Sequence, residues 1–273
     1  MNRILILGAS GYIGQAIYKE LCSYFDVYGT FYSNKSFAKN KHFFRYDLDY
    51  DGIDEIVLQV QPTIIISALR GDFAAQIEAH TFLTEYVKTK PCKLIFLSSA
   101  NVFDAYSSYP SYEFDKTLSE SIYGKLKIRI ENMLMRLPQK KYAIIRLPMV
   151  FGNNSPRILE IKDCLREKVP IEVFPNLVMN TISDKKLTQQ IHYMINRRKS
   201  GIFHLGAEDL IHHDEFFTEI LKSMNVKKPV FKNVYTSNFD RFLAVLPKDN
   251  KLPKHLATSN QETLAYISGK IKE

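Results

Sequence analysis

Tryptophan is absent from the 273-residue chain, and cysteine occurs three times. Cys22, Cys92 and Cys164 are far apart and show no C-x-x-C spacing, so they predict neither a disulfide framework nor a zinc site. No apolar run approaches the length of a membrane span, and the run after Met1 is too short for a signal peptide. We expect a cytoplasmic protein in a reducing compartment, with no membrane contact.

No long block of one charge sign occurs either, although Lys and Arg (37) outnumber Asp and Glu (29). The densest basic stretches are short, "PQKKY" at 138–142 and "NRRKS" at 196–200. A net charge of +8 suits anionic small molecules, but this scattered pattern does not favour nucleic acid as a partner. With 45% hydrophobic residues, the chain has the composition of a folded protein large enough for a domain with an added lobe.

Short apolar runs alternate with helical patterns through the first half of the chain. The expected strands are 3–8, 26–32, 42–48, 63–69, 93–99 and 142–148, and the expected helices are 12–24, 52–60, 72–89 and 119–136. The strand runs are continuously apolar, as in a parallel sheet covered by helices on both faces. We therefore predict an α/β fold with a Rossmann-like doubly wound parallel sheet and a smaller C-terminal substrate-binding lobe.

The alternation loosens beyond about residue 150, and several prolines interrupt the last 45 residues. We predict a Rossmann domain at 1–152 and a smaller lobe at 153–273 that is interleaved with it. Expected elements of the lobe are helices near 157–168, 183–197 and 213–224 and short strands at 170–174 and 201–206. The stretch "HHD" at 212–214 does not predict a metal site, because adjacent residues at a helix start point in different directions, and Asp214 is expected to cap that helix.

The first expected strand runs directly into "GASGYIG", a glycine turn that precedes a helix. Backbone N–H groups and the helix dipole at such a turn favour a pyrophosphate, and glycine lets the backbone approach it. The alternative is a merely tight strand-to-helix turn. Because the turn follows the first strand of an alternating pattern, we predict a dinucleotide site. Its candidate cofactor-binding residues are Gly8, Ser10, Gly11, Tyr12, Ile13 and Gly14.

The end of the second expected strand bears on which dinucleotide binds. An Asp or Glu there would accept the ribose hydroxyls of NAD, whereas the chain reads "TFYSNKSFAKNK" without a carboxylate. Small polar side chains and cations suit the 2′-phosphate of NADP, and the candidates are Ser33, Asn34 and Lys35, with Lys39 nearby. We predict NADP(H) as the cofactor, with NAD(H) as the less favoured choice.

Tyr123 and Lys127 are four residues apart, on one face of the expected helix at 119–136. Such a pair alone is usually a solvated helix edge. Upstream, however, the fifth strand ends with Ser98 and Ser99 at the sheet edge where open α/β sheets bind ligands. A cation beside a phenol lowers its pKa from about 10 toward a value useful for proton transfer. The serine, the Tyr-x-x-x-Lys pair and the glycine turn are more informative together than apart.

This combination resembles the extended short-chain dehydrogenase/reductase superfamily and, within it, the dTDP-4-dehydrorhamnose reductase branch of sugar-nucleotide reductases. The ten-residue step from Glu113 to Tyr123 also resembles that branch. The matching stretches cover nearly the whole chain and are "GASGYIG", "YDLDY", "QPTIIISAL", "LSSANVFD", "YEFDKTLSESIYGKLK", "IIRLPMVFG", "NTISDKKL" and "GIFHLGAED".

The resemblance implies an oxidoreductase that reduces a nucleotide-linked 4-keto-deoxysugar, with hydride from NADPH and a proton from Tyr123. Lys127 would be the partner of Tyr123, and Ser99 the third catalytic hydroxyl. It adds cofactor-binding candidates, of which Asp47 and Leu48 lie near the adenine: Asp47, Leu48, Ser67, Ala68, Leu69 and Pro148. The substrate-binding candidates are Arg70, Asn101, Val102 and Arg157, the two arginines being suited to a diphosphate. No metal ligand is expected, and a homodimer is left open.

The sequence departs from the branch after Ser99. Thr-Asp-Tyr is usual in the branch where this chain reads Ser99, Ala100 and Asn101, so the substrate stays open. Ala100 and Asn101 also cannot transfer the proton that a 4,6-dehydratase needs from its Asp-Glu pair, which disfavours elimination. Two alternatives remain: an epimerase of the same superfamily that keeps its nicotinamide bound, and a non-catalytic NADP-binding regulatory subunit.

Overall fold

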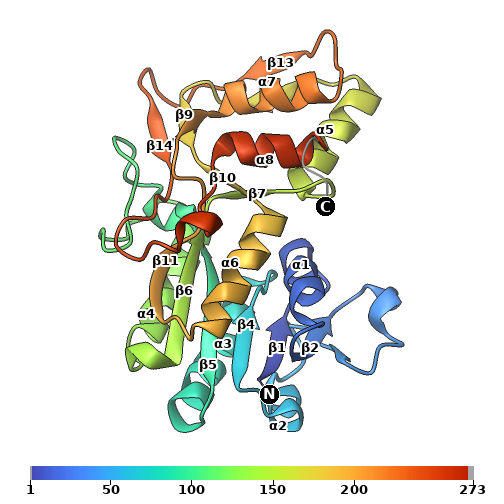
Figure 1. Ribbon diagram of the computed structural model, residues 1–273, viewed down its shortest axis with the longest axis vertical. Coiled ribbons are helices and arrows are strands. Elements are labelled where there is room, and N and C mark those ends of the chain that lie inside the picture. The colour runs from blue at the N-terminus through green and yellow to red at the C-terminus, as the bar shows by residue number, and fades with distance from the viewer. Residues whose placement is uncertain (1, 270–273) are drawn as a thin grey trace. The chain divides into compact units, whose positions relative to one another are not determined.

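The computed structural model describes residues 2–269 (Figure 1). By their contacts, the residues form two compact units. The first unit comprises the chain up to Ser99, Lys125–Ile145 and Ile191–Phe203; the second comprises Ala100–Gly124, Arg146–Gln190 and the chain from His204. The predicted domain boundary at residue 152 stays a prediction.

Within the described part of the chain, seven strands form one sheet, in the order β11-β6-β5-β4-β1-β2-β3. Strand β1 pairs in parallel with both β2 and β4, and the pairs β2·β3 and β4·β5 are also parallel. The chain thus runs outward from β1 to β3, then restarts at β4 on the other side of β1, which gives a doubly wound sheet. The predicted fold class is confirmed. The strands are β1 Arg3–Leu7, β2 Asp26–Phe31, β3 Phe43–Arg45, β4 Ile64–Ser67, β5 Lys93–Ser99, β6 Tyr142–Leu147 and β11 Gly201–His204.

Alternate residues of these strands face opposite sides of the sheet, and both sides are covered. Leu5 and Phe96 belong to a core cluster with side chains of α2, α3 and α4, such as Leu83 and Ile130. Helix α1 buries Ile17 and Leu21. Every residue of β4 and β6 is buried, which explains their unbroken apolar runs. The helices with residues in this unit are α1 Tyr12–Leu21, α2 Asp54–Val60, α3 Phe73–Thr89, α4 Ile122–Leu134 and α6 Asp184–Asn196, with 3₁₀ turns η1 Lys35–Phe37 and η3 Gln139–Lys141.

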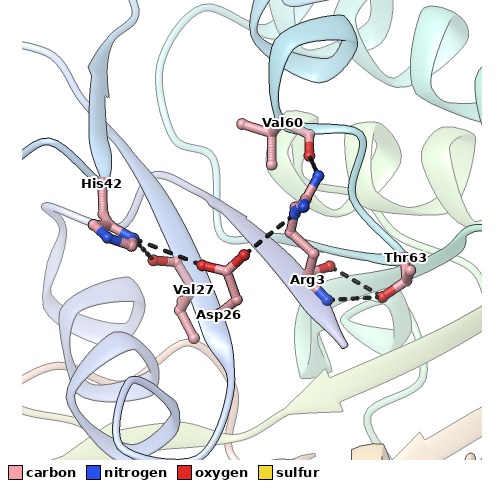
Figure 2. Close-up of polar contacts among 6 residues, drawn as sticks. All are labelled: Arg3, Asp26, Val27, His42, Val60 and Thr63. Atoms are coloured by element: carbon pink, nitrogen blue, oxygen red, sulfur yellow. Dashed lines mark hydrogen bonds and ion pairs between the residues drawn. The ribbon is translucent and has the colours of Figure 1, made fainter. Parts of the chain in front are cut away.

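A polar cluster ties together the starts of the central strands (Figure 2). The Arg3 guanidinium donates to Asp26 Oδ2 at 3.2 Å and to the Val60 carbonyl at 2.8 Å. Thr63 Oγ1 accepts from the Arg3 backbone N–H at 3.1 Å, and the His42 ring lies 3.9 Å from Asp26. These contacts secure the amino ends of β1 and β2. The glycine turn follows the carboxyl end of β1, and Ser98 and Ser99 lie at the carboxyl end of β5.

Among the described residues, the second unit contains short strands, the helices α5, α7 and α8, and the first part of α6. Strands β7 and β10 pair in parallel, β9 pairs with β12 and β14, and β8 pairs with β13. The bounds are β7 Met149–Phe151, β8 Ile171–Val173, β9 Leu177–Met179, β10 Thr181–Ser183, β12 Ile211–His212, β13 Phe231–Asn233, β14 Arg241–Leu243, α5 Pro156–Glu167, α7 His213–Ser223, α8 Asn260–Ile267, η2 Ala100–Phe103 and η4 Lys254–Leu256.

A separate apolar core supports the second unit, with Phe151, Ile161 and Phe216 among its buried members. The predicted helices α5, α6 and α7 are confirmed to within a residue or two. The predicted cap of α7 is wrong: His212 occupies the N-cap, and the Asp214 carboxylate accepts from the next backbone N–H instead. Strands β13 and β14 and helix α8 lie in the segment where the sequence shows no period.

Candidate functional site

The glycine turn has a shape that other residues cannot adopt at two of its positions. Gly8 has a φ of 77°, in the left-handed region, and a Cβ there would lie 2.7 Å from the Ala68 carbonyl oxygen. A Cβ on Gly14 would lie 2.2 Å from the Gly8 carbonyl oxygen. The turn therefore packs tightly against Ala68 and the backbone of Leu69, so the structure brings these predicted cofactor residues together.

Helix α1 begins immediately after this turn. Its N-cap is Gly11, which has no side chain to accept from the first-turn N–H groups. Ser10 lies within the same turn, and its backbone N–H donates to the Thr30 carbonyl at 3.3 Å. Thr30 Oγ1 also accepts from the Gly8 N–H at 2.8 Å. Thr30 is 2% exposed and orients the turn. In the sequence, this role is indicated only by the position of Thr30 near the end of a strand.

The residues predicted to select the cofactor lie just beyond β2. Ser33, Asn34 and Lys35 are exposed. Asn34 caps the turn η1, because its Oδ1 accepts from the backbone N–H of Ser36 at 3.1 Å. Lys35 is therefore the first residue of an ordered turn, and its exposed side chain is accessible to an anion.

Asp47 and Leu48 follow β3 in an acidic turn. Asp47 Oδ1 accepts from the Asp49 N–H at 3.3 Å, while the Asp47 N–H donates to Asp51 Oδ2 at 2.7 Å. Leu48 lies against Gly71, whose added Cβ would be 3.1 Å from its Cδ2. The same turn lines a hollow that also carries Asp54 and Glu78. Burial, and after it the charges of Asp51, Glu78, Asp47 and Asp49, raise the pKa of Tyr46, also in the hollow, to about 12. This acidic region does not favour a phosphate.

Ser67, at the end of β4, uses its hydroxyl inside the core. Its Oγ lies 2.9 Å from Nε2 of His80 on α3, and the His80 Nδ1 lies 2.6 Å from the Gln76 carbonyl. Burial lowers the pKa of His80 to about 4, so the ring is neutral. With its hydroxyl bonded to His80, Ser67 would contact a cofactor through its backbone. Its predicted role in cofactor binding stays a prediction.

The two serines that end β5 differ in surroundings. Ser98 is buried and donates its hydroxyl to Glu131 Oε1 of α4 at 2.5 Å. Ser99 is half-buried at the last residue of the strand. Successive strand residues point to opposite faces, which explains the difference. Of the two serines, Ser99 is the more exposed.

Lys127 lies in the interior of the first unit. Its side chain is 4% exposed, its Nζ donates to the Leu97 carbonyl at 3.1 Å, and the ammonium sits 4.7 Å from the centre of the Phe96 ring. Burial lowers the pKa of Lys127 to about 8, while the Glu131 carboxylate raises it and the Arg70 guanidinium lowers it. This ammonium can therefore lose or hold its proton within the ordinary range of an enzyme.

Tyr123 lies in the first turn of α4, and Lys127 follows one turn later on the same helix, as predicted. The Tyr123 side chain is 40% exposed. The start of the helix is fixed by Ser121, whose Oγ accepts from the Gly124 N–H at 3.0 Å and donates to Asp104 Oδ2 at 2.5 Å. Asp104 also accepts from the Glu120 N–H at 2.7 Å, so the turn that carries the phenol is anchored.

Gly124 is a further residue that the sequence reasoning missed. A Cβ at this position would lie 2.3 Å from the carbonyl oxygen of Asn101 and 2.1 Å from Ser119 Oγ. The glycine therefore allows η2, which carries the predicted substrate residues Asn101 and Val102, to approach the start of α4. A glycine inside an otherwise helical pattern was the available signal.

The remaining predicted site residues lie in varied surroundings. Val102 is fully buried, so a ligand could reach its backbone but not its side chain. Pro148 is buried against Gly206, whose added Cβ would lie 2.8 Å from it. Arg70 is exposed, and Arg157 pairs with Glu160 at 2.9 Å on the surface of α5. These substrate-binding roles stay predictions.

Glu113 and Arg146 form a buried pair in the second unit that the sequence reasoning also did not assign. The Glu113 carboxylate accepts from the backbone N–H groups of Lys248 and Asp249 at 3.1–3.2 Å. Arg146 donates to the Glu113 carbonyl at 2.9 Å, and its guanidinium lies over the Phe103 ring. The pair fastens the segment after β14 to the residues that precede α4.

Within residues 2–269, no cluster of three or more acidic, histidine or cysteine side chains has the arrangement of a metal site. No helix in that part of the chain is long and apolar enough to cross a membrane.

A doubly wound parallel sheet, a glycine turn after β1 and a Tyr-x-x-x-Lys helix define a Rossmann-type protein of the short-chain dehydrogenase/reductase kind. The RmlD substrate binding domain family matches residues 1–260, and the chain belongs to that family. The family resemblance inferred from the sequence is thereby confirmed.

Several solved structures share the fold over almost the whole chain. A dTDP-4-dehydrorhamnose reductase from Yersinia enterocolitica matches with a TM-score of 0.77 and 18% identity, over 98% of this chain and 99% of that one. The corresponding Bacillus anthracis protein, solved in complex with NADP, matches with a TM-score of 0.77 and 20% identity over 99% of both chains. A Thermus thermophilus UDP-glucose 4-epimerase in complex with NAD matches with a TM-score of 0.80 and 16% identity, over 98% of this chain and 100% of that one.

The curated relatives are named as enzyme subunits and not as reductases. The methionine adenosyltransferase 2 subunit beta of Danio rerio is 27% identical over 163 residues, which is 55% of this chain and 49% of the relative. The Bos taurus subunit is also 27% identical, over 171 residues, 55% of this chain and 48% of the relative. The chain thus spans about half the length of the curated relatives it matches.

Proposed function

We propose that the protein is an NADP-dependent reductase of a nucleotide-linked 4-keto-deoxysugar. The observation that carries this proposal is the helix α4, which presents an accessible Tyr123 one turn before a buried Lys127 ammonium. Support comes from the glycine turn and from solved dTDP-4-dehydrorhamnose reductases of the same fold. Together they favour carbonyl reduction as the reaction.

The chain's own residues fit a dinucleotide. Gly8 and Gly14 leave the backbone bare where a Cβ would fill the turn, and Gly11 opens the N-terminus of α1 to an anion. Lys35 and the small polar residues Ser33 and Asn34 suit a 2′-phosphate. A bound nicotinamide dinucleotide would supply the hydride.

Three side chains would complete the chemistry. Tyr123 donates a proton to the oxygen of the carbonyl as negative charge develops there, and the Lys127 ammonium favours the ionised phenol that remains. Ser99 donates a hydrogen bond to the same oxygen and orients it. Arg70 and Arg157 are each a candidate to bind the diphosphate of the substrate.

Cofactor titration and turnover with a matched pair of variants test this proposal. NADPH consumption with dTDP-4-dehydrorhamnose and related keto-sugar nucleotides should fall by a factor of 10² or more in Tyr123→Phe, about the contribution of general acid catalysis. Tyr109→Phe, which alters an exposed tyrosine of the same segment, should keep the wild-type rate. Wild-type protein that binds NADPH yet reduces none of these sugars would contradict the proposal.

A second candidate is a regulatory subunit that binds the dinucleotide without turnover. It is favoured by the curated relatives, which are named as a subunit of methionine adenosyltransferase. Co-expression with a catalytic methionine adenosyltransferase subunit, followed by size-exclusion chromatography, separates the two. Stoichiometric co-elution together with absent keto-sugar turnover would support the subunit, whereas separate elution would support the reductase.

An epimerase of the same superfamily remains the third candidate, since one structural neighbour is a UDP-glucose 4-epimerase. An epimerase would recycle its nicotinamide and retain it through purification. Release of free NADP⁺ after a single turnover would favour the reductase instead. For the reductase, we further propose a cytoplasmic location, with a homodimer as a possible assembly.

A further inference from the structure

Glu131 is a fully buried carboxylate that the proposed chemistry leaves without a role. It lies on α4 with 0% exposure, between apolar core residues such as Ile130 and Leu134. Ser98 donates to its Oε1 at 2.5 Å. An ionised carboxylate in such surroundings is costly unless it is both hydrogen-bonded and compensated by a positive charge.

The positive charge is one helical turn away. Lys127 precedes Glu131 by four residues on α4, which places the two side chains on one face of the helix. Lys127 is 4% exposed, and its ammonium contacts the Leu97 carbonyl and the Phe96 ring. The ring and the carbonyl solvate the ammonium in part, but neither carries the full negative charge that a buried lysine needs.

The other charged or titratable groups that act on Lys127 do not supply that charge. Arg70, after β4, carries a positive charge and disfavours the ammonium. His80, on α3, is buried and neutral at ordinary pH, with its pKa lowered to about 4 by burial. Tyr123, one turn earlier on α4, would carry a negative charge only while the proposed reaction proceeds. Glu131 therefore compensates Lys127 before the reaction begins.

We propose that Glu131 is a positioning residue: hydrogen-bonded by Ser98, it holds the Lys127 side chain in place as an ammonium on the face of α4 that also carries Tyr123. The effect of this pairing on turnover rests on the proposed function. The pairing itself is a property of the folded protein without cofactor or substrate. The two serines that end β5 then have separate tasks, since Ser98 secures Glu131 and Ser99 is the proposed substrate contact.

The pH dependence of unfolding measures the pairing without a cofactor or substrate. Lys127 has a pKa of about 8 in the folded chain against 10.5 as the ordinary value. Between these limits the unfolded chain binds more protons than the folded chain, so the free energy of unfolding rises with pH across that window. The part due to Lys127 is the difference between wild type and Lys127→Met.

Urea unfolding of the apo protein across this pH range, in wild type and in Glu131→Gln, is the experiment. The amide keeps an acceptor for Ser98 but removes the charge, so the rise due to Lys127 should begin about one pH unit or more lower, as expected for loss of a nearby opposite charge. Glu85→Gln, at an exposed position of α3, should leave the wild-type curve unchanged. Coincident curves for wild type and Glu131→Gln would overturn the proposal.

A double variant keeps the test decisive if Glu131→Gln does not fold. In that case the proposal expects Lys127→Met/Glu131→Gln to regain folding, because the uncompensated buried ammonium is removed. A double variant that also fails to fold would overturn the pairing.

Turnover supplies a separate readout. Glu131→Gln should lower kcat with little change in the KM of the sugar nucleotide, and more activity should survive at low pH, where Lys127 keeps its proton. A shifted unfolding curve in a protein without reductase activity would support the pairing and contradict the proposed function. Reductase activity with unshifted curves would do the reverse.

Discussion

The hydroxyl of Ser67 donates to the Nε2 of His80, 2.9 Å away in the interior of the first unit. The direction follows from the other ring nitrogen, because Nδ1 lies 2.6 Å from the Gln76 carbonyl oxygen and must carry the hydrogen. The neutral ring thus joins the end of β4 to α3, directly beside the Ala68 and Leu69 backbone that packs against the glycine turn.

Protonation of His80 should lower the free energy of unfolding at low pH. Burial lowers the pKa of His80 from 6.5 to about 4, so the unfolded chain binds more protons between these values. The free energy of unfolding therefore falls as pH decreases from 6.5 toward 4. His204 and His213, with pKa values of about 3 and 4, contribute in the same direction.

The His80 contribution is isolated by His80→Gln in urea unfolding at a series of pH values. The variant is expected to be less stable than wild type near neutral pH but to show a shallower loss of stability below pH 6.5. Parallel wild-type and variant curves would contradict the assigned neutral ring.

Gly14→Ala should disrupt the nucleotide turn. The added methyl group would meet the Gly8 carbonyl oxygen at 2.2 Å, so backbone must shift. We expect a drop in stability of about 2–3 kcal/mol, the cost of overpacking, and a loss of NADPH affinity of at least tenfold. Ala16→Gly in the same helix is the control for helix propensity and should cost about 1 kcal/mol without changing affinity. Equal behaviour of the two variants would contradict the tight turn.

Ser121→Ala should loosen the start of α4. It removes the acceptor for the Gly124 N–H and the donor to Asp104, and loss of an N-cap costs about 1 kcal/mol. Because Tyr123 lies in this turn, kcat should fall several-fold, while NADPH affinity, which depends on α1, should not change. Calorimetry and steady-state kinetics measure the two effects, and unchanged kcat with lowered stability would show that the cap does not position the phenol.

Lys35→Ala should reduce the preference for NADPH. Removing a cation beside the expected 2′-phosphate should weaken NADPH binding several-fold and leave NADH binding unchanged, with the difference shrinking at high salt. Lys41→Ala, an exposed lysine of the same segment, serves as the control. Fluorescence titration measures both affinities. Equal losses for the two cofactors would place the 2′-phosphate elsewhere.

The first half of the fold could be predicted because local signals and tertiary packing agree there. Strands such as β4 and β6 are apolar at nearly every residue, and the glycine turn follows β1 directly. The second unit gave weaker signals, because its strands are two or three residues long and α8 has eight residues, too short to show a period.

The candidate site was predictable where its residues form a spacing motif, as with Tyr123 and Lys127. It was not predictable where the function of a side chain depends on a distant partner. Thr30, His80 and Glu131 act through contacts with segments 13 to 33 residues away, and a single sequence gives no measure of these distances. The i, i+4 spacing of Lys127 and Glu131 was the available hint.

Transfer of deuterium tests the central claim most directly. The protein would be incubated with NADPH deuterated at the transferable position and with dTDP-4-dehydrorhamnose or a related keto-sugar nucleotide, and the mass of the sugar product recorded for wild type and for Tyr123→Phe. The account predicts a carbon-bound deuterium in the wild-type product and little product from the variant. Sugar recovered without deuterium, from wild-type protein shown to bind NADPH, would contradict it.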